Sequence, residues 1–259
     1  MKGIIPPHLM QHLSNRFEII GDVSIVSIPQ ELDDYRGDIA KQIISKKRNI
    51  RTVLNKISKL VGDKRIAEFE ILLGDNTETV HREYGYIYKL DVKEVFFNGR
   101  LSFERRRIAS MVSSSEHVLV PFCGVGPFAV PVAARGARVI AIEKNDDACR
   151  WLAENIWING VNDNISVIKG DAFNIKKMLS CTFDRIIVPT PYGMDYFLKD
   201  ISHLVKNGGM VHFYTFKKQY QIEGLIKEYQ DMGFEVSFYR RCGNVAPGVS
   251  RWVFDLLKK

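Results

Sequence analysis

From His117 onward, short apolar runs alternate with longer amphipathic stretches. The apolar runs have strand length and predict strands at 117–121, 138–142, 164–169, 184–188, 209–216, 234–240 and 250–256. The stretches between them predict helices at 127–135, 146–159, 194–206 and 219–232. Because strands that alternate with helices form parallel sheets covered on both faces, this part of the chain predicts an α/β domain with a seven-stranded parallel sheet.

The pattern before residue 98 is different and mixes strand and helix signals. Residues 17–29 alternate apolar and polar positions around Gly21 and Asp22, which predicts a hairpin. An amphipathic helix is predicted at 33–48, followed by β-rich stretches at 64–73 and 79–92 and a helical stretch at 100–112. We therefore predict a small α+β domain over residues 1–98 and the α/β domain over residues 99–259.

Composition narrows the class of protein. Hydrophobic residues make up 46% and charged residues 26% of the 259, as in ordinary globular proteins. No run approaches the ~18 apolar residues of a membrane span, and the first residues lack the apolar core of a secretory signal, so we expect a cytoplasmic protein. The four cysteines and six histidines show no ligand-like spacing, which predicts no metal site.

The net charge of +7 indicates a polyanionic partner, because the basic residues are clustered. The clusters are Lys46-Lys47-Arg48 with Arg51, Arg105-Arg106-Arg107, Lys217-Lys218 and Arg240-Arg241. Several such patches on one face would attract nucleic acid.

The most informative segment is the glycine turn after the strand at 117–121, FCGVGPF. Gly124 and Gly126 allow a sharp turn and a close approach of the backbone to a ligand. Glu143 follows Gly124 by 19 positions and ends the next strand, close to the ~20 expected for an acid that binds ribose hydroxyls. The segment therefore predicts a site for a nucleoside-containing cofactor.

Two cofactor classes compete for this turn. Residues 124–129 satisfy the dinucleotide pattern G-x-G-x-x-G/A, which is typical of dehydrogenases. Pro127, however, removes one of the backbone N–H groups that a pyrophosphate needs at the start of a helix. Asp171 follows the third strand of this domain, and Pro189 and Pro191 follow the fourth. This order of turn, acid, acid and proline loop favours S-adenosylmethionine.

With these motifs in place, the chain resembles the archaeal and eukaryal tRNA (guanine-37 N1)-methyltransferase family and its sister, the wybutosine-synthesising aminocarboxypropyltransferases. The resemblance extends over nearly the whole sequence, through EIIGDVSIV, RLSFERRRIA, FCGVGPF, AIEKND, LAENIWINGV, GDAF and GGMVHFYTF. It implies a class I methyltransferase (Rossmann-like) fold preceded by a small tRNA-recognition domain. It also implies S-adenosylmethionine as cofactor and the tRNA anticodon loop as partner; we expect a monomer.

The resemblance assigns Arg65 and Glu104 as the catalytic pair. Guanine N1 carries a proton, so Glu104 would act as the base, while Arg65 would stabilise the negative charge on O6. The expected cofactor-binding residues are Phe122, Gly124, Gly126, Glu143, Asp171, Pro189 and Pro191. The expected substrate-binding residues are Arg100 and Arg105, and Tyr192, which would stack on a base.

Three departures from the family pattern keep alternatives open. Val120 stands where the family usually has an acid, and Pro189-Thr190-Pro191-Tyr192 replaces an Asn-Leu-Pro signature. Residues 246–249 look more like the aminocarboxypropyl branch. The HFYTF segment and the Arg65/Glu104 pair favour methyl transfer to N1 of guanosine 37. Aminocarboxypropyl transfer, a non-catalytic RNA-binding role, and methylation of another RNA or a small molecule are the alternatives.

Overall fold

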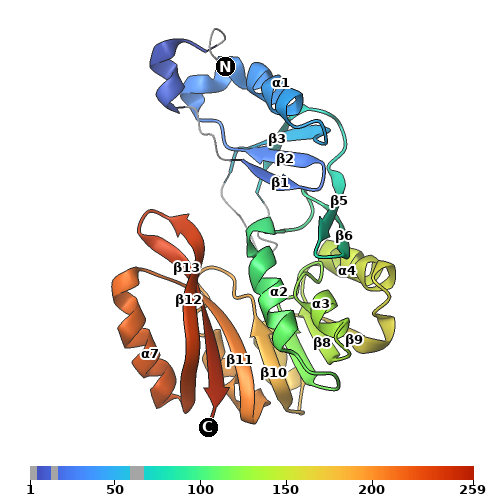
Figure 1. Ribbon diagram of the computed structural model, residues 1–259, viewed down its shortest axis with the longest axis vertical. Coiled ribbons are helices and arrows are strands. Elements are labelled where there is room, and N and C mark those ends of the chain that lie inside the picture. Colours follow the sequence, from blue (N-terminus) through green and yellow to red (C-terminus); the bar gives the residue numbers. More distant parts are fainter. Residues whose placement is uncertain (1–4, 13–16, 59–66) are drawn as a thin grey trace. The chain divides into compact units, whose positions relative to one another are not determined.

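The computed structural model describes residues 5–12, 17–58 and 67–259 (Figure 1). The chain divides into two compact units, Met1–Gly99 and Arg100–Lys259. The boundary predicted from the sequence lies one residue before this division. Among the described residues, no helix is both long enough and apolar enough to cross a membrane.

The first unit is built on a four-stranded sheet. Its elements are η1 (Pro7–His12), β1 (Glu18–Ile20), β2 (Val23–Val26), η2 (Gln30–Tyr35), α1 (Arg36–Lys46), β3 (Thr52–Lys56), β4 (Phe69–Leu73), β5 (Glu78–Glu83) and β6 (Tyr86–Asp91), where η marks a 3₁₀ helix. The sheet order is β1-β2-β3-β4, and β5 and β6 form a separate hairpin. Because α1 connects β2 to β3, these two strands are parallel, whereas the other neighbours are antiparallel.

Most sequence predictions for this unit match the described elements. The β1–β2 hairpin forms at 17–29, with Gly21 at φ 57° in its turn. The helix predicted at 33–48 begins at Arg36, because a 3₁₀ helix occupies residues 30–35. Strand β3 was not predicted, and part of the β-rich stretch at 64–73 lies outside the described residues.

The second unit contains a seven-stranded sheet. Its elements are η3 (Gly99–Leu101, which crosses the division), α2 (Ser102–Met111), β7 (His117–Pro121), α3 (Ala129–Ala133), β8 (Arg138–Glu143), α4 (Asp146–Ile158), η4 (Asn162–Asn164), β9 (Ile165–Lys169), η5 (Ala172–Asn174), α5 (Ile175–Met178), β10 (Phe183–Val188), α6 (Phe197–Ile201), η6 (Ser202–Leu204), β11 (Val205–Lys217), η7 (Gln219–Gln221), α7 (Ile222–Asp231), β12 (Phe234–Ala246) and β13 (Val249–Lys258). The sheet order is β12-β13-β11-β10-β7-β8-β9. All seven predicted strands are present.

The prediction of an entirely parallel sheet was wrong for one strand. β13 is antiparallel to both of its neighbours, β11 and β12. The reason is local: no helix separates β12 from β13, and a two-residue connection can only join antiparallel strands. The remaining strands are parallel, and the reversal of strand order lies between β7 and β10.

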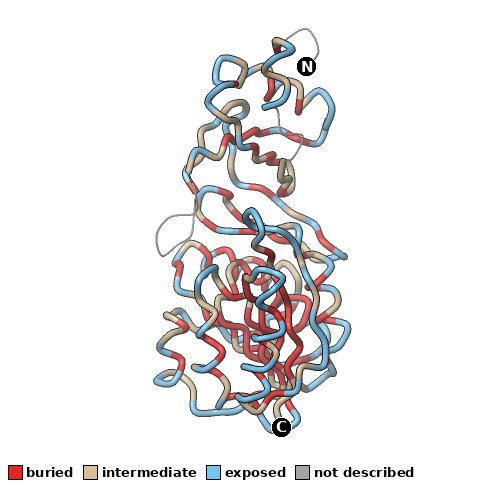
Figure 2. Tube along the Cα trace, turned by 90° about the vertical axis from the view of Figure 1, so that its left-hand side faces the viewer, coloured by how far each residue is buried: buried red, intermediate tan, exposed pale blue. Residues whose placement is uncertain are grey.

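The core of this unit lies around the central strands. Figure 2 shows that its buried residues gather in the strands of the sheet. One apolar cluster joins β10, β11 and β13 to the helices α5, α6 and α7, through residues such as Val188, Phe213, Phe254, Phe197 and Leu225. Burial of these side chains stabilises the fold by about 25 cal/mol for each Å² of apolar surface removed from water. The sheet therefore forms a stable base for the loops at the carboxyl ends of its strands.

Candidate functional site

The glycine turn lies at the carboxyl end of β7, where parallel-sheet proteins bind ligands. Phe122, Gly124 and Gly126 all have positive φ, at 55°, 57° and 91°. A Cβ on Gly126 would lie 2.7 Å from Leu152 Cδ1, so this glycine allows α4 to pack closely. A Cβ on Gly124 would meet nothing within 4 Å and would extend into open space. The space beside Gly124 is therefore open.

Glu143 ends β8 directly beside this turn. Its Oε2 accepts a hydrogen bond from the Gly124 amide at 2.8 Å. Its Oε1 accepts hydrogen bonds from the amides of Lys144 and Asn145, each at 2.8 Å. The glycine turn predicted to lie against the cofactor is therefore joined to the end of β8 by Glu143, the acid predicted to bind the ribose, and these hydrogen bonds fix the orientation of its carboxylate.

Asp171 follows β9 at the same edge of the sheet. Its Oδ1 accepts a hydrogen bond from the Phe173 amide at 3.1 Å, and its Oδ2 lies 3.0 Å from Lys144 Nζ. The ring of Phe122 lies 5.8 Å from that of Phe173, so the turn and the Asp171 segment are in contact. The edge of the sheet therefore brings together Glu143, Asp171 and the open space beside Gly124. This arrangement fits the nucleoside of S-adenosylmethionine, with one acid expected at the ribose and the other at the adenine amino group.

The proline loop after β10 lies next to the end of β11. Thr190 forms a tight turn in which its amide donates to the carbonyl of Val188 at 2.8 Å. Tyr192 is 53% exposed, and its ring centroid lies 5.1 Å from that of Phe216. Asp195 accepts hydrogen bonds from Thr215 and Lys217, both at 2.6 Å. This anchor was missed from the sequence, because a lone acid in a loop has no distinguishing pattern.

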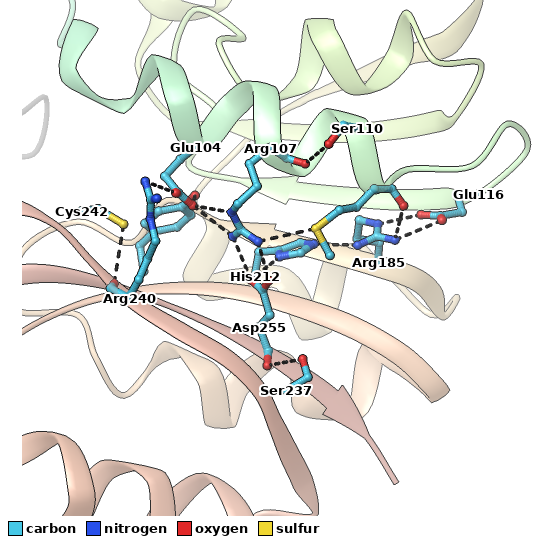
Figure 3. Close-up of polar contacts among 12 residues, drawn as sticks. Glu104, Arg107, Ser110, Glu116, Arg185, His212, Ser237, Arg240, Cys242 and Asp255 are labelled. Atoms are coloured by element: carbon cyan, nitrogen blue, oxygen red, sulfur yellow. Dashed lines mark hydrogen bonds and ion pairs between the residues drawn. The ribbon is translucent and has the colours of Figure 1, made fainter.

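Glu104 is buried on α2 among basic side chains (Figure 3). Its Oε2 accepts hydrogen bonds from Arg107 at 3.0 Å and from the Tyr214 hydroxyl at 3.3 Å. Its Oε1 lies 2.7 Å from Arg240 Nη2. The Tyr214 ring contacts Phe128, which follows the glycine turn, at a centroid distance of 5.4 Å. Glu104 is thus linked to the candidate cofactor site, while its predicted partner Arg65 lies outside the described residues.

The two arginines expected to bind substrate differ in exposure. Arg100 is exposed, as a phosphate contact requires. Arg105 is only 2% exposed, and its guanidinium lies 6.0 Å from the centroid of the Phe128 ring. This position does not fit the expected phosphate contact. The cause is helical periodicity: within FERRR, the face of α2 that carries Glu104, Arg105 and Ile108 is buried, while Phe103 and Arg106 point to solvent.

A buried group of charged residues extends from Glu104 across the sheet (Figure 3). Arg107 binds Asp255 on β13 through two hydrogen bonds of 2.6 and 3.0 Å. Asp255 contacts His212 on β11, and His212 contacts Arg185 on β10, both at 2.6 Å. The only sequence signal was a charged or polar residue inside an apolar strand, as in VHFYTF and WVFDLL. That signal does not show that His212 and Asp255 belong to one cluster.

The charges of these groups follow from their surroundings. Burial alone would raise the pKa of the Asp255 carboxyl, but the hydrogen bonds from His212 and Arg107 lower it to about 2. Burial lowers the pKa of His212; Arg185 and Arg107 act in the same direction, while Asp255 opposes them. At neutral pH, Asp255 is therefore ionised and His212 is neutral.

His212 is expected to weaken the fold as the pH falls. Its pKa is lower in the folded state than the unfolded value near 6.5, so below that pH the unfolded chain binds more protons. The free energy of unfolding should then decrease by at most about 1.4 kcal/mol per pH unit for this one group. Urea unfolding between pH 7.5 and 5.5 measures this slope, which His212→Gln should reduce. His203→Gln, at an exposed position, should leave it unchanged; equal slopes in both variants would contradict the assignment.

Candidate metal ligands do not converge in the part of the chain that the structure describes. No group of three or more His, Cys, Asp or Glu side chains there is placed to hold a metal ion. Within the same residues, Cys123, Cys149, Cys181 and Cys242 are free thiols. Burial raises the pKa of Cys123 well above its ordinary value, so this thiol is protonated.

Comparison with curated proteins gives relatives from two branches. Trm5b of Pyrococcus abyssi, a tRNA (guanine(37)-N(1))-methyltransferase, is 38% identical over 82% of this chain. The match spans 63% of that relative's length, less than two thirds. The tRNA(Phe) (4-demethylwyosine(37)-C(7)) aminocarboxypropyltransferase of Pyrococcus horikoshii is 31% identical over 97% of this chain and 92% of its own length.

Solved structures of both branches have the same fold. A complex of aTrm5 and tRNALeu matches 98% of this chain and 75% of that chain, with a TM-score of 0.87 and 28% identity. P. horikoshii TYW2 with MeSAdo matches 98% of this chain and 95% of its own, with a TM-score of 0.79 and 29% identity. M. jannaschii TYW2, which matches 93% of this chain and 98% of its own, contains AdoMet (TM-score 0.67, 27% identity). The predictions of a class I methyltransferase fold and of S-adenosylmethionine as cofactor are confirmed.

Family descriptions cover most of the chain. The TRM5/TYW2 methyltransferase domain matches residues 79–236, and the TYW2 N-terminal domain matches residues 1–77. The family consists of S-adenosylmethionine-dependent tRNA-modifying enzymes with Trm5 and TYW2 members. The chain belongs to the TRM5/TYW2 methyltransferase family.

Proposed function

We propose that this protein transfers a methyl group to N1 of guanosine 37 in tRNA. The observation that carries the proposal is the Glu104 carboxylate, buried on α2 and linked through Tyr214 and Phe128 to the glycine turn. The 38% identity to Trm5b of P. abyssi, which has this activity by name, supports the choice.

The chemistry requires a base and a stabilised purine. Guanine N1 carries a proton and becomes a good nucleophile only when the proton leaves. Among the described residues, Oε1 of Glu104 has an ion-pair contact with Arg240 Nη2 at 2.7 Å but no hydrogen bond of good geometry, so it can take that proton once Arg240 moves aside. Arg65 would donate to O6 and stabilise the negative charge that develops there. S-adenosylmethionine, when bound, supplies the electrophilic methyl group; Gly124, Glu143 and Asp171 would hold its nucleoside.

Recognition of tRNA would use exposed cations and an exposed ring. Arg100 and Arg241 are exposed on the second unit, where they can bind phosphates. Tyr192, next to Phe216 at the end of β11, offers a face on which an unstacked base can lie. We assign tRNA recognition by residues 1–98 as a further part of this proposal. An anticodon loop, whose bases are accessible, is the expected contact.

Aminocarboxypropyl transfer to a tricyclic derivative of the same guanosine is a second candidate. It is favoured by the match of residues 1–77 to the TYW2 N-terminal domain and by the 92% coverage of the P. horikoshii aminocarboxypropyltransferase. The replacement of the Asn-Leu-Pro signature by Pro189-Thr190-Pro191 is consistent with a change near the reacting end of the cofactor. Both candidates use the same nucleoside site but break different bonds to sulfur.

Two differently labelled cofactors separate the candidates. The protein is incubated with tRNA lacking modification at position 37, or with tRNA carrying the tricyclic precursor, and with S-adenosylmethionine labelled in its methyl or its carboxyl carbon. We expect methyl label in 1-methylguanosine and no carboxyl label, measured by nucleoside mass spectrometry. A tRNA with adenosine 37 is the control. Transfer of the carboxyl label to the tricyclic base would overturn methyl transfer, and absence of cofactor binding in calorimetry would favour a non-catalytic RNA-binding protein.

A further inference from the structure

A continuous chain of buried and partly buried charged side chains connects Glu104 to Glu116, which precedes β7. Its carboxylates are Glu116, Asp255 and Glu104, and its guanidiniums are Arg185, Arg107 and Arg240, so the charges balance. His212 lies between Arg185 and Asp255 with no exposed surface. Buried ions are tolerated only when each has a partner, and here each partner is shared with the next residue. Figure 3 shows these side chains in sequence.

The hydrogen bonds in this chain have a determined direction. Arg185 Nη1 lies 2.6 Å from His212 Nε2, and a guanidinium can only donate. Nε2 must therefore be the acceptor, which places the proton of neutral His212 on Nδ1. That N–H donates to Asp255 Oδ1 at 2.6 Å. Arg185 is itself held by Glu116 at 2.7 Å and by the Met111 carbonyl at 3.0 Å. The result is a rigid, ionised Asp255.

Asp255 in turn determines how Arg107 approaches Glu104. Nη1 and Nη2 of Arg107 donate to the two oxygens of Asp255 at 2.6 and 3.0 Å. This bidentate contact fixes the guanidinium plane. The adjacent edge of the Arg107 guanidinium, formed by Nε and Nη2, lies 3.0 Å from Oε2 of Glu104. Because Tyr214 also donates to Oε2, the hydrogen bonds from the described residues converge on that oxygen, and from the same residues Oε1 has only the ion-pair contact with Arg240.

This sharing matters when Glu104 takes up a proton. A neutral Glu104 would no longer balance Arg107, whose side chain is only 17% exposed. An unpaired buried cation is costly, and that cost would raise the barrier to proton transfer. Asp255 keeps Arg107 paired before and after the transfer. The network therefore keeps Arg107 paired with a carboxylate in both protonation states of Glu104.

We propose that Asp255 is a positioning residue that acts through Arg107: it holds Oε2 of Glu104, keeps Arg107 paired, and so leaves Oε1 as the atom that receives the guanine N1 proton. The inference rests on the proposed function of Glu104 as general base. In the transfer, the N1–H bond would break and its proton would form a bond to Oε1. The N1 electron pair would form the bond to the methyl carbon while the bond between that carbon and the cofactor's sulfur breaks, and the electron pair of that bond would stay on sulfur in the departing thioether. Arg240, whose side chain is 37% exposed, moves from Oε1 as the base enters.

A double-mutant cycle with Asp255→Asn and Glu104→Gln tests this role under single-turnover conditions. Asp255→Asn alone should lower the rate about 10- to 100-fold, as for a misplaced catalytic group, with the KM for tRNA and the affinity for S-adenosylmethionine within about twofold of wild type. In the Glu104→Gln background it should cause no further loss, because its effect passes through Glu104. Asp200→Asn, on a surface ion pair with Lys176, is the matched control.

The outcomes separate the two proposals. Equal losses in both backgrounds would show a merely structural role and overturn the positioning role. A full rate in Asp255→Asn, with Glu104→Gln inactive, would overturn it while leaving the proposed base intact. A fully active Glu104→Gln would instead overturn the base, and the positioning role with it. Arg107→Lys, which keeps the charge but cannot make the bidentate contact, should reproduce the loss and provides the test if Asp255→Asn does not fold.

Discussion

Replacing Glu104 with glutamine is expected to slow methyl transfer by about 10²- to 10⁴-fold, the contribution of a positioned general base. Glutamine has nearly the same shape and can still accept from Arg107 and Tyr214 through its amide oxygen. It cannot accept the N1 proton, so the loss should appear in the chemical step. Single-turnover rates with unmodified tRNA measure it, and calorimetry should find S-adenosylmethionine binding unchanged.

Glu228→Gln is the matched control for this substitution. Glu228 lies on α7 in an exposed ion pair with Lys199, whereas Glu104 is buried. Removing the charge of Glu228 should therefore leave the rate of methyl transfer unchanged. A Glu104→Gln protein that binds cofactor and retains the wild-type rate would contradict the general-base role. A protein that loses both binding and activity would indicate a structural effect, which thermal unfolding of the variant would reveal.

Replacing Gly126 with alanine is expected to lower the free energy of unfolding by about 2–5 kcal/mol, the combined range of left-handed backbone strain and overpacking. Gly126 has φ 91°, and its added Cβ would lie 2.7 Å from Leu152 and 3.2 Å from Val130. Leu152 is fully buried on α4, so it has little room to move. Urea unfolding measures the change, and loss of S-adenosylmethionine binding should accompany it.

Gly160 provides the control for backbone strain alone. It has φ 64°, and an added Cβ would meet nothing within 4 Å. Gly160→Ala should therefore cost only the strain of the left-handed conformation, about 1–2 kcal/mol, and leave cofactor binding unchanged. Equal destabilisation by both substitutions would mean that the contact with Leu152 has no role.

Local patterns were enough to predict the seven strands of the second unit's sheet and the glycine turn, although they did not predict β3 of the first unit. Period and length identify a buried strand from its own residues, and the turn combines two glycines with Glu143 at a defined spacing. The direction of β13 was predicted wrongly. Alternation of strands with helices implies parallel strands, but no helix lies between β12 and β13, and β13 is antiparallel to both of its neighbours. The direction of β13 depends on the short connection at residues 247–248, and this connection can be recognised as a turn only when the ends of β12 and β13 are known.

The chemistry around Glu104 could be predicted only in part. Family resemblance selected Glu104, but its contacts come from residues distant in sequence; Arg107 and Asp255 are 148 positions apart. Nothing in WVFDLL reveals that its acid lies beneath α2. Arg105 illustrates the same limit, because three consecutive arginines look equivalent in sequence and the helix gives each a different environment.

The place of β13 in the sheet has a consequence for how the protein is made. This strand, the last of the sheet in sequence, lies between β11 and β12 rather than at an edge. During synthesis, β12 and the edge of β11 that faces away from β10 therefore lack strand partners until residues 249–258 leave the ribosome and insert between them. Asp255 arrives in that same step, so Arg107 lacks this partner until the sheet closes. We expect α2 to reach its final arrangement only after β13 has joined the sheet, and the preceding stage, with its exposed strand edges, to be the one most prone to aggregation.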